Sequence, residues 1–263
     1  MTPANTTHII RAPVEVRCQQ ELEKLKAWDR WSKPPGWQLS PRAVEVFVLG
    51  DSSLGIRPKY VGDRERVQVA IATLASDRAL LLVGEPGTAK SWLSEHLSAA
   101  ICGNSQLTVQ GTAGTTEDQI KYSWNYALLI AEGPSERALV PSPILTAMRK
   151  GQIARFEEVT RCASEVQDAL ISILSEKAMA IPELERIEYA QRGFNIIATA
   201  NTRDRGVNEM SSALKRRFNF VELPVLSDLQ QEVQIVRQRA QEMLSEQGLP
   251  TDLPDDVVET LVT

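Results

Sequence analysis

A short apolar run that ends at a glycine constrains the fold of this chain more than any other feature of its sequence. Residues 79–83 read Ala-Leu-Leu-Leu-Val and are followed by Gly84. A segment that is apolar at every position is typical of a strand buried on both faces of a parallel sheet. Helical patterns separate it from similar runs at residues 107–109, 153–156, 194–200 and 218–223. This alternation predicts an α/β fold with a parallel five-stranded sheet flanked by helices.

The composition removes several classes of protein. The chain has 263 residues, of which 43% are hydrophobic and 24% are charged, as in an ordinary soluble protein. Its two histidines, His8 and His96, provide little material for histidine-based metal sites or catalytic triads. Because no apolar run approaches the roughly 20 residues that span a bilayer, and residues 1–11 lack the layout of a secretory signal, we expect a cytoplasmic protein with no membrane partner. A net charge of −5 makes nucleic acid an unlikely partner.

The helical patterns divide the chain into three predicted parts. Residues 1–45 form an N-terminal helical extension, with a helix over 14–31. Residues 46–224 hold the five apolar runs and form the predicted α/β domain. Residues 225–263 start with a long helical pattern, and a further helix begins near 254–263.

The segment between the first apolar run and the next helix has the chemistry of a phosphate-binding loop. From Gly84 to Ser91 it reads Gly-Glu-Pro-Gly-Thr-Ala-Lys-Ser. The glycines let backbone N–H groups turn toward phosphate oxygens, Lys90 places a cation on the β- and γ-phosphates, and Ser91 can ligate Mg²⁺. Ala89 stands where the usual pattern has glycine, so we expect a negative φ there. The alternative is a strand-to-helix turn that binds nothing.

Two adjacent carboxylates follow the third apolar run. Glu157 and Glu158 come directly after residues 153–156. Glu157 is predicted to hold Mg²⁺ with its water shell, and Glu158 to orient and activate the attacking water. Arg155 weakens the strand pattern. Taken alone, the pair is typical of a solvated strand end, and it is the upstream loop that favours the catalytic interpretation.

A polar residue and a group of cations complete the candidate site. Asn201 directly follows the run 194–200 and is suited to hydrogen-bond water and the γ-phosphate. An asparagine at this position can also cap a turn. Lys215, Arg216 and Arg217 are adjacent cations that need an anionic partner. The γ-phosphate of a neighbouring subunit would supply one, with an arginine stabilising the transition-state charge. The alternative is a solvated basic helix end.

The phosphate loop, the acidic pair, Asn201 and the cations at 215–217, in this order along the chain, resemble an AAA+ ATPase. Their residue sequences are most similar to the MoxR-like branch of that family. The resemblance covers about residues 60–223. Residues 60–63 resemble the adenine-side box of the family, and residues 84–91 resemble its Walker A loop. The segment that starts at Glu157 resembles the Walker B region, and Asn201 resembles sensor 1.

The resemblance implies ATP and Mg²⁺ as cofactors and a role for each matching residue. Ser91 and Glu157 would contact the metal. The implied catalytic residues are Glu158, Lys90, Asn201 and either Arg217 or Arg216. The implied nucleotide-binding residues are Val61, Gly62, Glu85, Pro86, Gly87, Thr88, Ala89, Lys90, Ser91 and Trp92.

The sequence departs from the family pattern in ways that bear on catalysis. The family usually has aspartate where Glu157 stands, and the extra methylene shifts the carboxylate on the metal side. The arginine finger of the family precedes a phenylalanine, which favours Arg217, yet Arg216 is equally able to reach across an interface. Only the beginning of a helical lid is expected within 225–263, and no residue is assigned to sensor 2.

The resemblance also implies an assembly. Such proteins form hexameric rings that remodel protein clients, and MoxR-like members work with partners that carry a von Willebrand factor A domain. Residues 115–147, with Trp124 and Tyr126, fall where AAA+ rings place substrate-contacting elements, although these aromatic side chains are equally suited to packing against the domain. Residues 177–189 are predicted to form a protruding hairpin. Two other functions stay open: a nucleotide-gated scaffold with weak hydrolysis, and a motor subunit that depends on nucleic acid or GTP.

Overall fold

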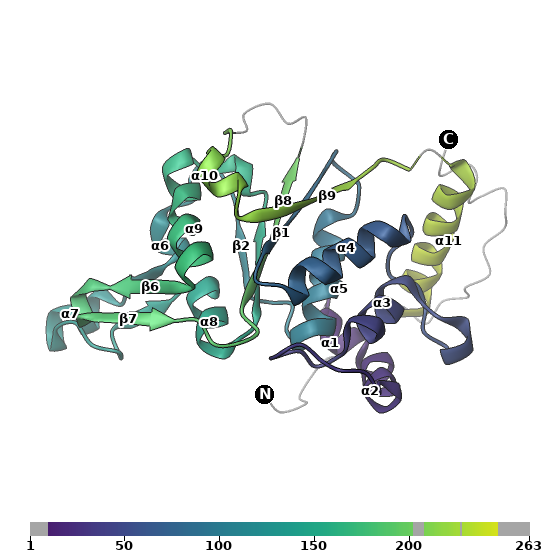
Figure 1. The fold of residues 1–263 in the computed structure, drawn as a ribbon, viewed down its shortest axis with the longest axis horizontal. Coiled ribbons are helices and arrows are strands. Elements are labelled where there is room, and N and C mark those ends of the chain that lie inside the picture. The colour runs from purple at the N-terminus through teal and green to yellow at the C-terminus, as the bar shows by residue number, and fades with distance from the viewer. Residues whose placement is uncertain (1–9, 202–207, 227, 247–263) are drawn as a thin grey trace.

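The centre of the molecule is a five-stranded parallel sheet. The computed structural model describes residues 10–201, 208–226 and 228–246. The strand order is β2-β5-β8-β1-β9, and every neighbouring pair is parallel (Figure 1). The strands are β1 (Ala79–Gly84), β2 (Thr108–Gln110), β5 (Ile153–Glu157), β8 (Asn195–Asn201) and β9 (Phe218–Leu223). Each predicted apolar run therefore corresponds to one strand, and the predicted sheet is confirmed.

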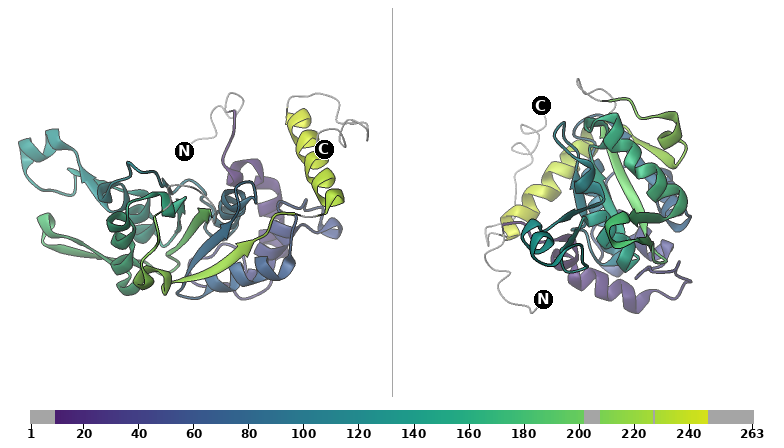
Figure 2. Two further views of the ribbon diagram at one scale, coloured as in Figure 1. Left: turned by 90° about the horizontal axis from the view of Figure 1, so that it is seen from above. Right: turned by 90° about the vertical axis from the view of Figure 1, so that its left-hand side faces the viewer.

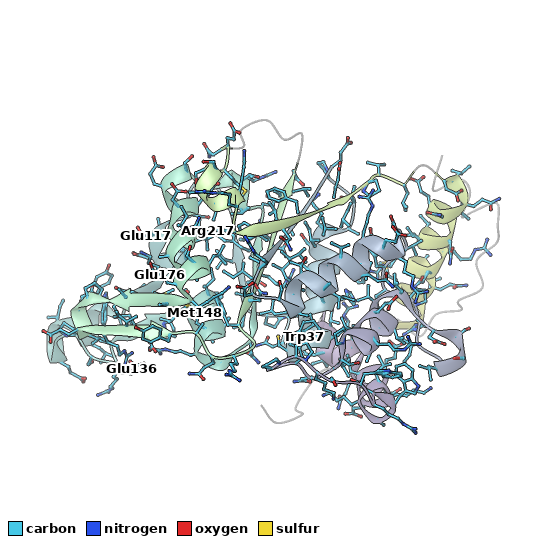
Figure 3. All side chains as sticks on the ribbon, viewed as in Figure 1. Trp37, Glu117, Glu136, Met148, Glu176 and Arg217 are labelled. Carbon is cyan, nitrogen blue, oxygen red and sulfur yellow. The ribbon has the colours of Figure 1, made fainter. Side chains whose placement is uncertain are left out.

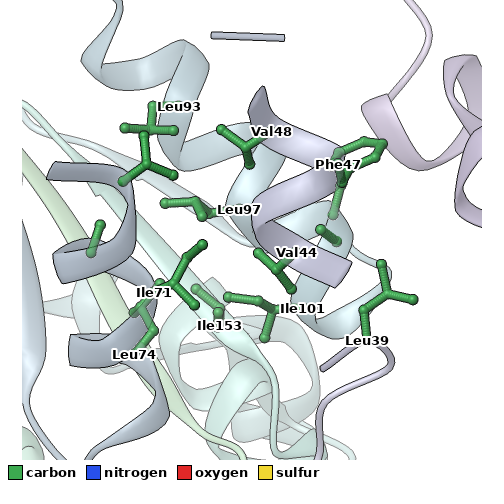
Figure 4. Packing of buried hydrophobic residues seen from close by; sticks show 14 of the residues in the cluster. Leu39, Val44, Phe47, Val48, Ile71, Leu74, Leu93, Leu97, Ile101 and Ile153 are labelled. Carbon is green, nitrogen blue, oxygen red and sulfur yellow. The ribbon is translucent and has the colours of Figure 1, made fainter. Parts of the chain in front are cut away.

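Helices cover both faces of the sheet, which explains why the inner strand β1 is apolar along its length (Figure 1). Along β1, Leu80 and Leu82 belong to one hydrophobic cluster, while Ala79 and Leu81 belong to another. The first cluster includes side chains of α3 (Pro41–Leu49), α4 (Arg64–Ala75) and α5 (Lys90–Cys102), and the second includes α8 (Pro143–Lys150) and α9 (Ser164–Glu176). In Figure 4, Ile153 of β5 lies among the α5 side chains of the first cluster.

The helix starts follow ordinary capping chemistry. The Ser40 hydroxyl accepts a hydrogen bond from the Ala43 N–H, and Pro41 occupies the first turn of α3. Ser142 caps α8 in the same way, again with a proline in the first turn. Gly151, with φ of 60°, ends α8 in the left-handed conformation that glycine adopts without strain.

The N-terminal segment packs into the core of the α/β domain. The sequence predicts one helix over 14–31, but the structure has α1 (Val14–Arg17) and α2 (Gln19–Trp28). Cys18, with φ of −104° and ψ of 19°, lies between them and interrupts the helical backbone. Val14 and Leu25 are fully buried in the first cluster. The predicted boundary between residues 45 and 46 falls inside α3.

Two β-hairpins and a short helix form an arm at one end of the molecule. The elements of the arm are β3 (Tyr122–Trp124), α7 (Tyr126–Glu132), β4 (Leu139–Pro141), β6 (Ala178–Ile181) and β7 (Arg186–Tyr189). The strands β6 and β7 pair in antiparallel fashion, which confirms the hairpin predicted over 177–189. Figures 1 and 2 show the arm at the opposite end of the molecule from α11 (Leu229–Glu246).

Ion pairs clamp the parts of the arm together. Arg149 of α8 contacts Glu136 at 2.7 Å and Glu188 of β7 at 2.5 Å. Arg186 of β7 also reaches Glu136, at 2.5 Å, and Figure 3 shows where Glu136 lies on the arm. The two arginines and two carboxylates alternate in charge, so the network ties both hairpins to the domain.

The structure describes only part of the two terminal segments of the chain. Helix α11 lies within residues 225–263, where the sequence predicts the start of a lid. Residues 247–263, where the sequence predicts the end of this helix and the start of another, lie outside the described residues. His8 lies outside them as well. Within residues 10–201, 208–226 and 228–246, every helix is too short or too polar to cross a membrane.

Candidate nucleotide-binding site

Three neighbouring strands deliver the predicted site residues to one edge of the sheet. Gly84 at the end of β1 lies opposite Asn201 at the end of β8. The next strand in the sheet, β5, ends at Glu157. The carboxyl ends of parallel strands form the edge where ligands bind in open α/β sheets. The phosphate loop, the acidic pair and Asn201 therefore start from the same edge.

The phosphate loop contradicts one expectation about Ala89. The sequence predicts a negative φ for this residue, but Ala89 has φ of 62° and ψ of 25°, the left-handed conformation, directly before α5. Its methyl group meets the strain that usually reserves this conformation for glycine, and the strain is about 1–2 kcal/mol. Gly87 also has a positive φ, of 87°, and a methyl group there would meet no neighbouring atom within 4 Å. The prediction was wrong because the loop keeps its left-handed turn up to the first residue of the helix.

Lys90 lies against the loop that precedes it. The side chain is buried, and its Nζ donates hydrogen bonds to the carbonyl oxygens of Gly84, at 3.1 Å, and Glu85, at 2.6 Å. These contacts hold the cation against the backbone of the loop. In phosphate-binding loops the lysine at this position of the pattern contacts the β- and γ-phosphates.

A cavity of about 380 Å³ lies beside the loop, between it and α11. Its size falls in the range of small-molecule sites. The predicted nucleotide-binding residues that line it are Val61, Pro86, Gly87, Thr88, Ala89 and Trp92. The α11 residues that line it are Glu232, Ile235, Gln238 and Arg239. The contribution of α11 was missed from the sequence, although these residues follow a helical spacing and therefore share one face of the helix.

Four predicted nucleotide-binding residues lie elsewhere around the loop. A methyl group added at Gly62 would come within 2.7 Å of the Tyr60 ring, so Gly62 allows Tyr60 to pack there. Ser91 lines a second cavity, while Glu85 and Lys90 form the loop itself.

Trp92 links the loop helix to α11. Its Nε1 donates to the Lys59 carbonyl oxygen at 2.6 Å. The guanidinium carbon of Arg239 lies 3.4 Å from the centroid of the Trp92 ring. This stack closes one side of the cavity with a cation and an aromatic face.

Glu157 is a buried carboxylate that accepts hydrogen bonds at both oxygens. The Ser91 and Thr199 hydroxyls donate to Oε2 at 2.6 and 2.8 Å. The Ser94 hydroxyl and Arg155 donate to Oε1, each at 2.7 Å. Burial by itself would raise the pKa of Glu157, but the Arg155 guanidinium and the three hydroxyl donors bring the pKa below its ordinary value. The carboxyl group is therefore ionised at neutral pH.

The residues at this edge fit a magnesium ion. Ser91 and Glu157 present a hydroxyl and a carboxylate oxygen 2.6 Å apart, and Mg²⁺ prefers such oxygen ligands. The described part of the chain has no cluster of three or more histidine, cysteine, aspartate or glutamate side chains that could hold a metal. Mg²⁺ is commonly bound by one or two carboxylates together with waters and substrate phosphates.

Glu158 occupies a second left-handed position at the same edge. It has φ of 56°, its N–H donates to the Thr199 hydroxyl at 2.9 Å, and its carboxylate pairs with Arg161 at 2.7 Å. Its side chain is partly exposed, unlike that of Glu157. A methyl group at Gly111 would come within 2.3 Å of the Glu158 carbonyl oxygen, so the chain after β2 passes closely over this turn. Ala89 and Glu158 thus both have strained backbone at this edge of the sheet, and such strain is typical of a functional site.

The cations at 215–217 are not brought to the phosphate loop of their own chain. They precede β9, whose first residue Phe218 lies opposite Ala79, while its last residue lies opposite Gly84. At a strand rise of about 3.3 Å per residue, roughly 17 Å separates the two edges. Arg217 donates to the Ser175 hydroxyl and to the Ala213 carbonyl oxygen, and Figure 3 places it at the start of β9. Arg216 is exposed.

Comparison with known families agrees with this geometry. Residues 79–218 match the AAA domain of the dynein-related subfamily. The chain belongs to this family. An AAA domain binds nucleotide, and the match begins with β1 and ends where β9 begins. The predicted AAA+ fold is therefore confirmed.

Relatives of this AAA domain protein extend over most of the chain. The uncharacterized protein YehL of Escherichia coli (strain K12) is 54% identical over 265 residues, which cover 100% of this chain and 73% of that protein. The uncharacterized protein SH1500 of Staphylococcus haemolyticus (strain JCSC1435) is 26% identical over 64% of each chain. A solved structure from Cytophaga hutchinsonii ATCC 33406, named as a "putative ATPase", has a TM-score of 0.55 at 16% identity. The alignment covers 94% of this chain and 66% of that one, and it supports the fold alone.

Proposed function

We propose that this AAA domain protein hydrolyses ATP with Mg²⁺ and uses the cycle to remodel or mature a protein client. One observation supports the proposal above all: the Lys90 loop, the Glu157–Glu158 pair and Asn201 start from the carboxyl ends of three neighbouring strands. A triphosphate bound at that edge would meet a cation, a metal-binding carboxylate and a polar side chain together.

Each residue has a distinct role in the proposed reaction. The loop N–H groups and Lys90 bind the phosphates, and Asn201 orients the γ-phosphate and the attacking water. Glu158 accepts a proton from that water. Ser91 and Glu157 would hold Mg²⁺, which would neutralise charge on the phosphate oxygens. The base and ribose occupy the cavity between the loop and α11.

The proposed active form is a ring in which a neighbouring subunit completes each site. Arg216 and Arg217 precede β9 at the opposite edge of the sheet from the phosphate loop. An arginine from there can stabilise the transition state only in another subunit. We further propose a hexamer and, by family resemblance, a partner with a von Willebrand factor A domain. The exposed Tyr126 and Ile130 of the arm are candidate client contacts, whereas Trp124 packs against the second cluster.

Two substitutions test the proposed hydrolysis. Lys90→Ala is expected to abolish binding of labelled ATP, because the phosphates lose their cation. Glu158→Gln is expected to keep ATP binding and to lower phosphate release by about 100-fold or more, the usual contribution of a general base. The exposed Glu165→Gln, at the start of α9, is the matched control and should hydrolyse ATP at the wild-type rate. Unchanged turnover in Glu158→Gln would remove Glu158 from this role.

A second candidate is a nucleotide-gated scaffold that hydrolyses ATP weakly. The observation in its favour is that Glu157 and Glu158 are both already paired with arginines, Arg155 and Arg161. Steady-state phosphate release separates the two functions. A wild-type protein that binds ATP and assembles, but releases no phosphate above the Glu158→Gln level, would support the scaffold.

A further inference from the structure

An arginine that the proposed reaction does not use lies directly beside the metal-binding carboxylate. Arg155 is buried within β5, with 8% of its surface exposed. Its Nε donates to the Ser94 hydroxyl at 3.0 Å, and its Nη1 donates to the Ser105 carbonyl oxygen at 2.9 Å. Its Nη2 donates to Glu157 at 2.7 Å and to the Ser91 carbonyl oxygen at 3.2 Å. The guanidinium group thus has a fixed orientation, set by α5, by the segment before β2 and by its own strand.

The two oxygens of Glu157 face different groups. Oε1 accepts from Arg155 and Ser94, on the inner side of the site. Oε2 accepts from Ser91 and Thr199, and Ser91 is the loop residue that would contact Mg²⁺. One carboxylate therefore joins a buried cation to the metal side of the phosphate loop.

The strand geometry makes this arrangement depend on side-chain length. Arg155 and Glu157 are two residues apart on β5, so their side chains lie on the same face, toward α5. A glutamate is long enough to meet Ser91 while its other oxygen stays on the guanidinium. An aspartate at this position would have its carboxylate one methylene closer to the strand and could not keep both contacts.

We propose that Arg155 is a positioning residue that holds Oε1 of Glu157 and so directs Oε2 toward the magnesium ion bound at Ser91. A glutamate at position 157 can contact Arg155 through one oxygen and the metal through the other. Partners that orient a metal ligand in this way commonly change metal affinity by about 10–100-fold when they are removed. The inference deepens the proposed function, since it concerns the same metal position.

The test is a comparison of nucleotide affinity with and without Mg²⁺. Fluorescent ADP is titrated into each variant in excess Mg²⁺ and in EDTA, and the ratio of the two affinities is the Mg²⁺-dependent gain. Arg155→Lys and Arg155→Met are expected to reduce this gain about tenfold or more, while the affinity in EDTA stays at the wild-type value because the Lys90 loop is intact. Arg149→Met, which removes an arginine–glutamate pair on the arm, is the control and should keep the full gain.

Two further variants keep the proposal testable if loss of Arg155 unfolds the protein. Glu157→Asp retains both charges and is expected to reduce the gain about tenfold, although aspartate is itself a good magnesium ligand. Adding Arg155→Met to Glu157→Asp should restore part of the gain, because the shorter carboxylate is then released from the arginine. The effects of the two substitutions would thus be coupled and not additive.

Several results would overturn the inference. A gain that stays within twofold of the wild type in a folded Arg155 variant would do so, as would an unchanged gain in Glu157→Asp. Additive effects in the double variant, or a wild-type gain near one, would also contradict it. Because the readout is binding and not turnover, a protein that binds Mg²⁺ and nucleotide without hydrolysing ATP would defeat the proposed function and leave this inference standing.

Discussion

At the scale of single residues, the site is marked by backbone strain at Ala89. This residue has a φ of 62°, which disfavours any side chain larger than that of glycine. Ala89→Gly relieves about 1–2 kcal/mol of strain but increases the entropy of the unfolded chain by about 0.4–1 kcal/mol. We expect a net gain of up to about 1.6 kcal/mol in the free energy of unfolding, measured by urea denaturation.

A second alanine provides the control for this substitution. Ala72 is exposed inside α4, so Ala72→Gly should lower the free energy of unfolding by about 1 kcal/mol, as glycine does in helix interiors. The two alanines should therefore respond with opposite signs. A loss at Ala89→Gly as large as the loss at Ala72→Gly would contradict the left-handed conformation.

At the scale of elements, α5 carries a buried histidine that makes stability depend on pH. His96 is 1% exposed, and its Nδ1 lies 2.8 Å from the Trp92 carbonyl oxygen, which can only accept. Nδ1 therefore carries a hydrogen that it donates to this oxygen. Burial lowers the pKa of His96 from 6.5 to about 3, although the bond to Trp92 opposes the shift. Below pH 6.5 the unfolded chain binds a proton that the folded chain does not.

This difference predicts an acid-side loss of stability. The contribution of His96 is fully present above pH 6.5 and falls by about 1.4 kcal/mol per pH unit as the pH drops toward 3. His96→Gln cannot titrate, so its free energy of unfolding should decline less steeply between pH 6.5 and 4.5 than that of the wild type. Urea denaturation at several pH values measures both slopes. Parallel curves for the two proteins would contradict a neutral, buried His96.

The elements also divide what the sequence could predict from what it could not. Short apolar runs predicted every strand of the parallel sheet, because burial of a strand leaves a local pattern of apolar residues in the sequence. The break at Cys18 was missed, since a short irregular backbone inside a helical pattern has no such pattern of its own. The α11 wall of the cavity was missed too, because which face of a helix meets the loop depends on tertiary packing.

The candidate site shows the same division. The phosphate loop and the acidic pair were predicted from residue type and order, because their chemistry requires particular side chains after particular strands. Arg155 was interpreted as a weak point of the strand. Its partners, Ser94 and Ser105, are distant in sequence, so a buried arginine that donates hydrogen bonds from all three side-chain nitrogens could not be recognised before the fold was known.

At the scale of the whole molecule, the phosphate loop follows the carboxyl end of β1, whereas Arg216 and Arg217 precede the amino end of β9, at the opposite ends of the strands of one sheet (Figure 1). A single subunit therefore cannot bring its own arginine to its own nucleotide. If turnover requires an arginine from a neighbour, ATPase activity per subunit should rise with protein concentration as subunits associate. Arg216 is exposed and Arg217 is bonded to Ser175 and Ala213 of its own chain, so we expect Arg216 to be the residue that crosses the interface.

Mixing two inactive variants tests this arrangement directly. Arg216→Ala keeps an intact nucleotide site but should lose about 1000-fold in turnover, as expected when an arginine finger is removed. Lys90→Ala cannot bind nucleotide but still offers Arg216. An equimolar mixture should recover measurable phosphate release, because each Arg216→Ala site can then receive an arginine from a Lys90→Ala neighbour. If Arg217→Ala, and not Arg216→Ala, is the inactive variant that regains activity when it is mixed with Lys90→Ala, the arginine finger is Arg217. If neither mixture exceeds its separate components while wild-type activity still rises with concentration, the sites are completed by another residue.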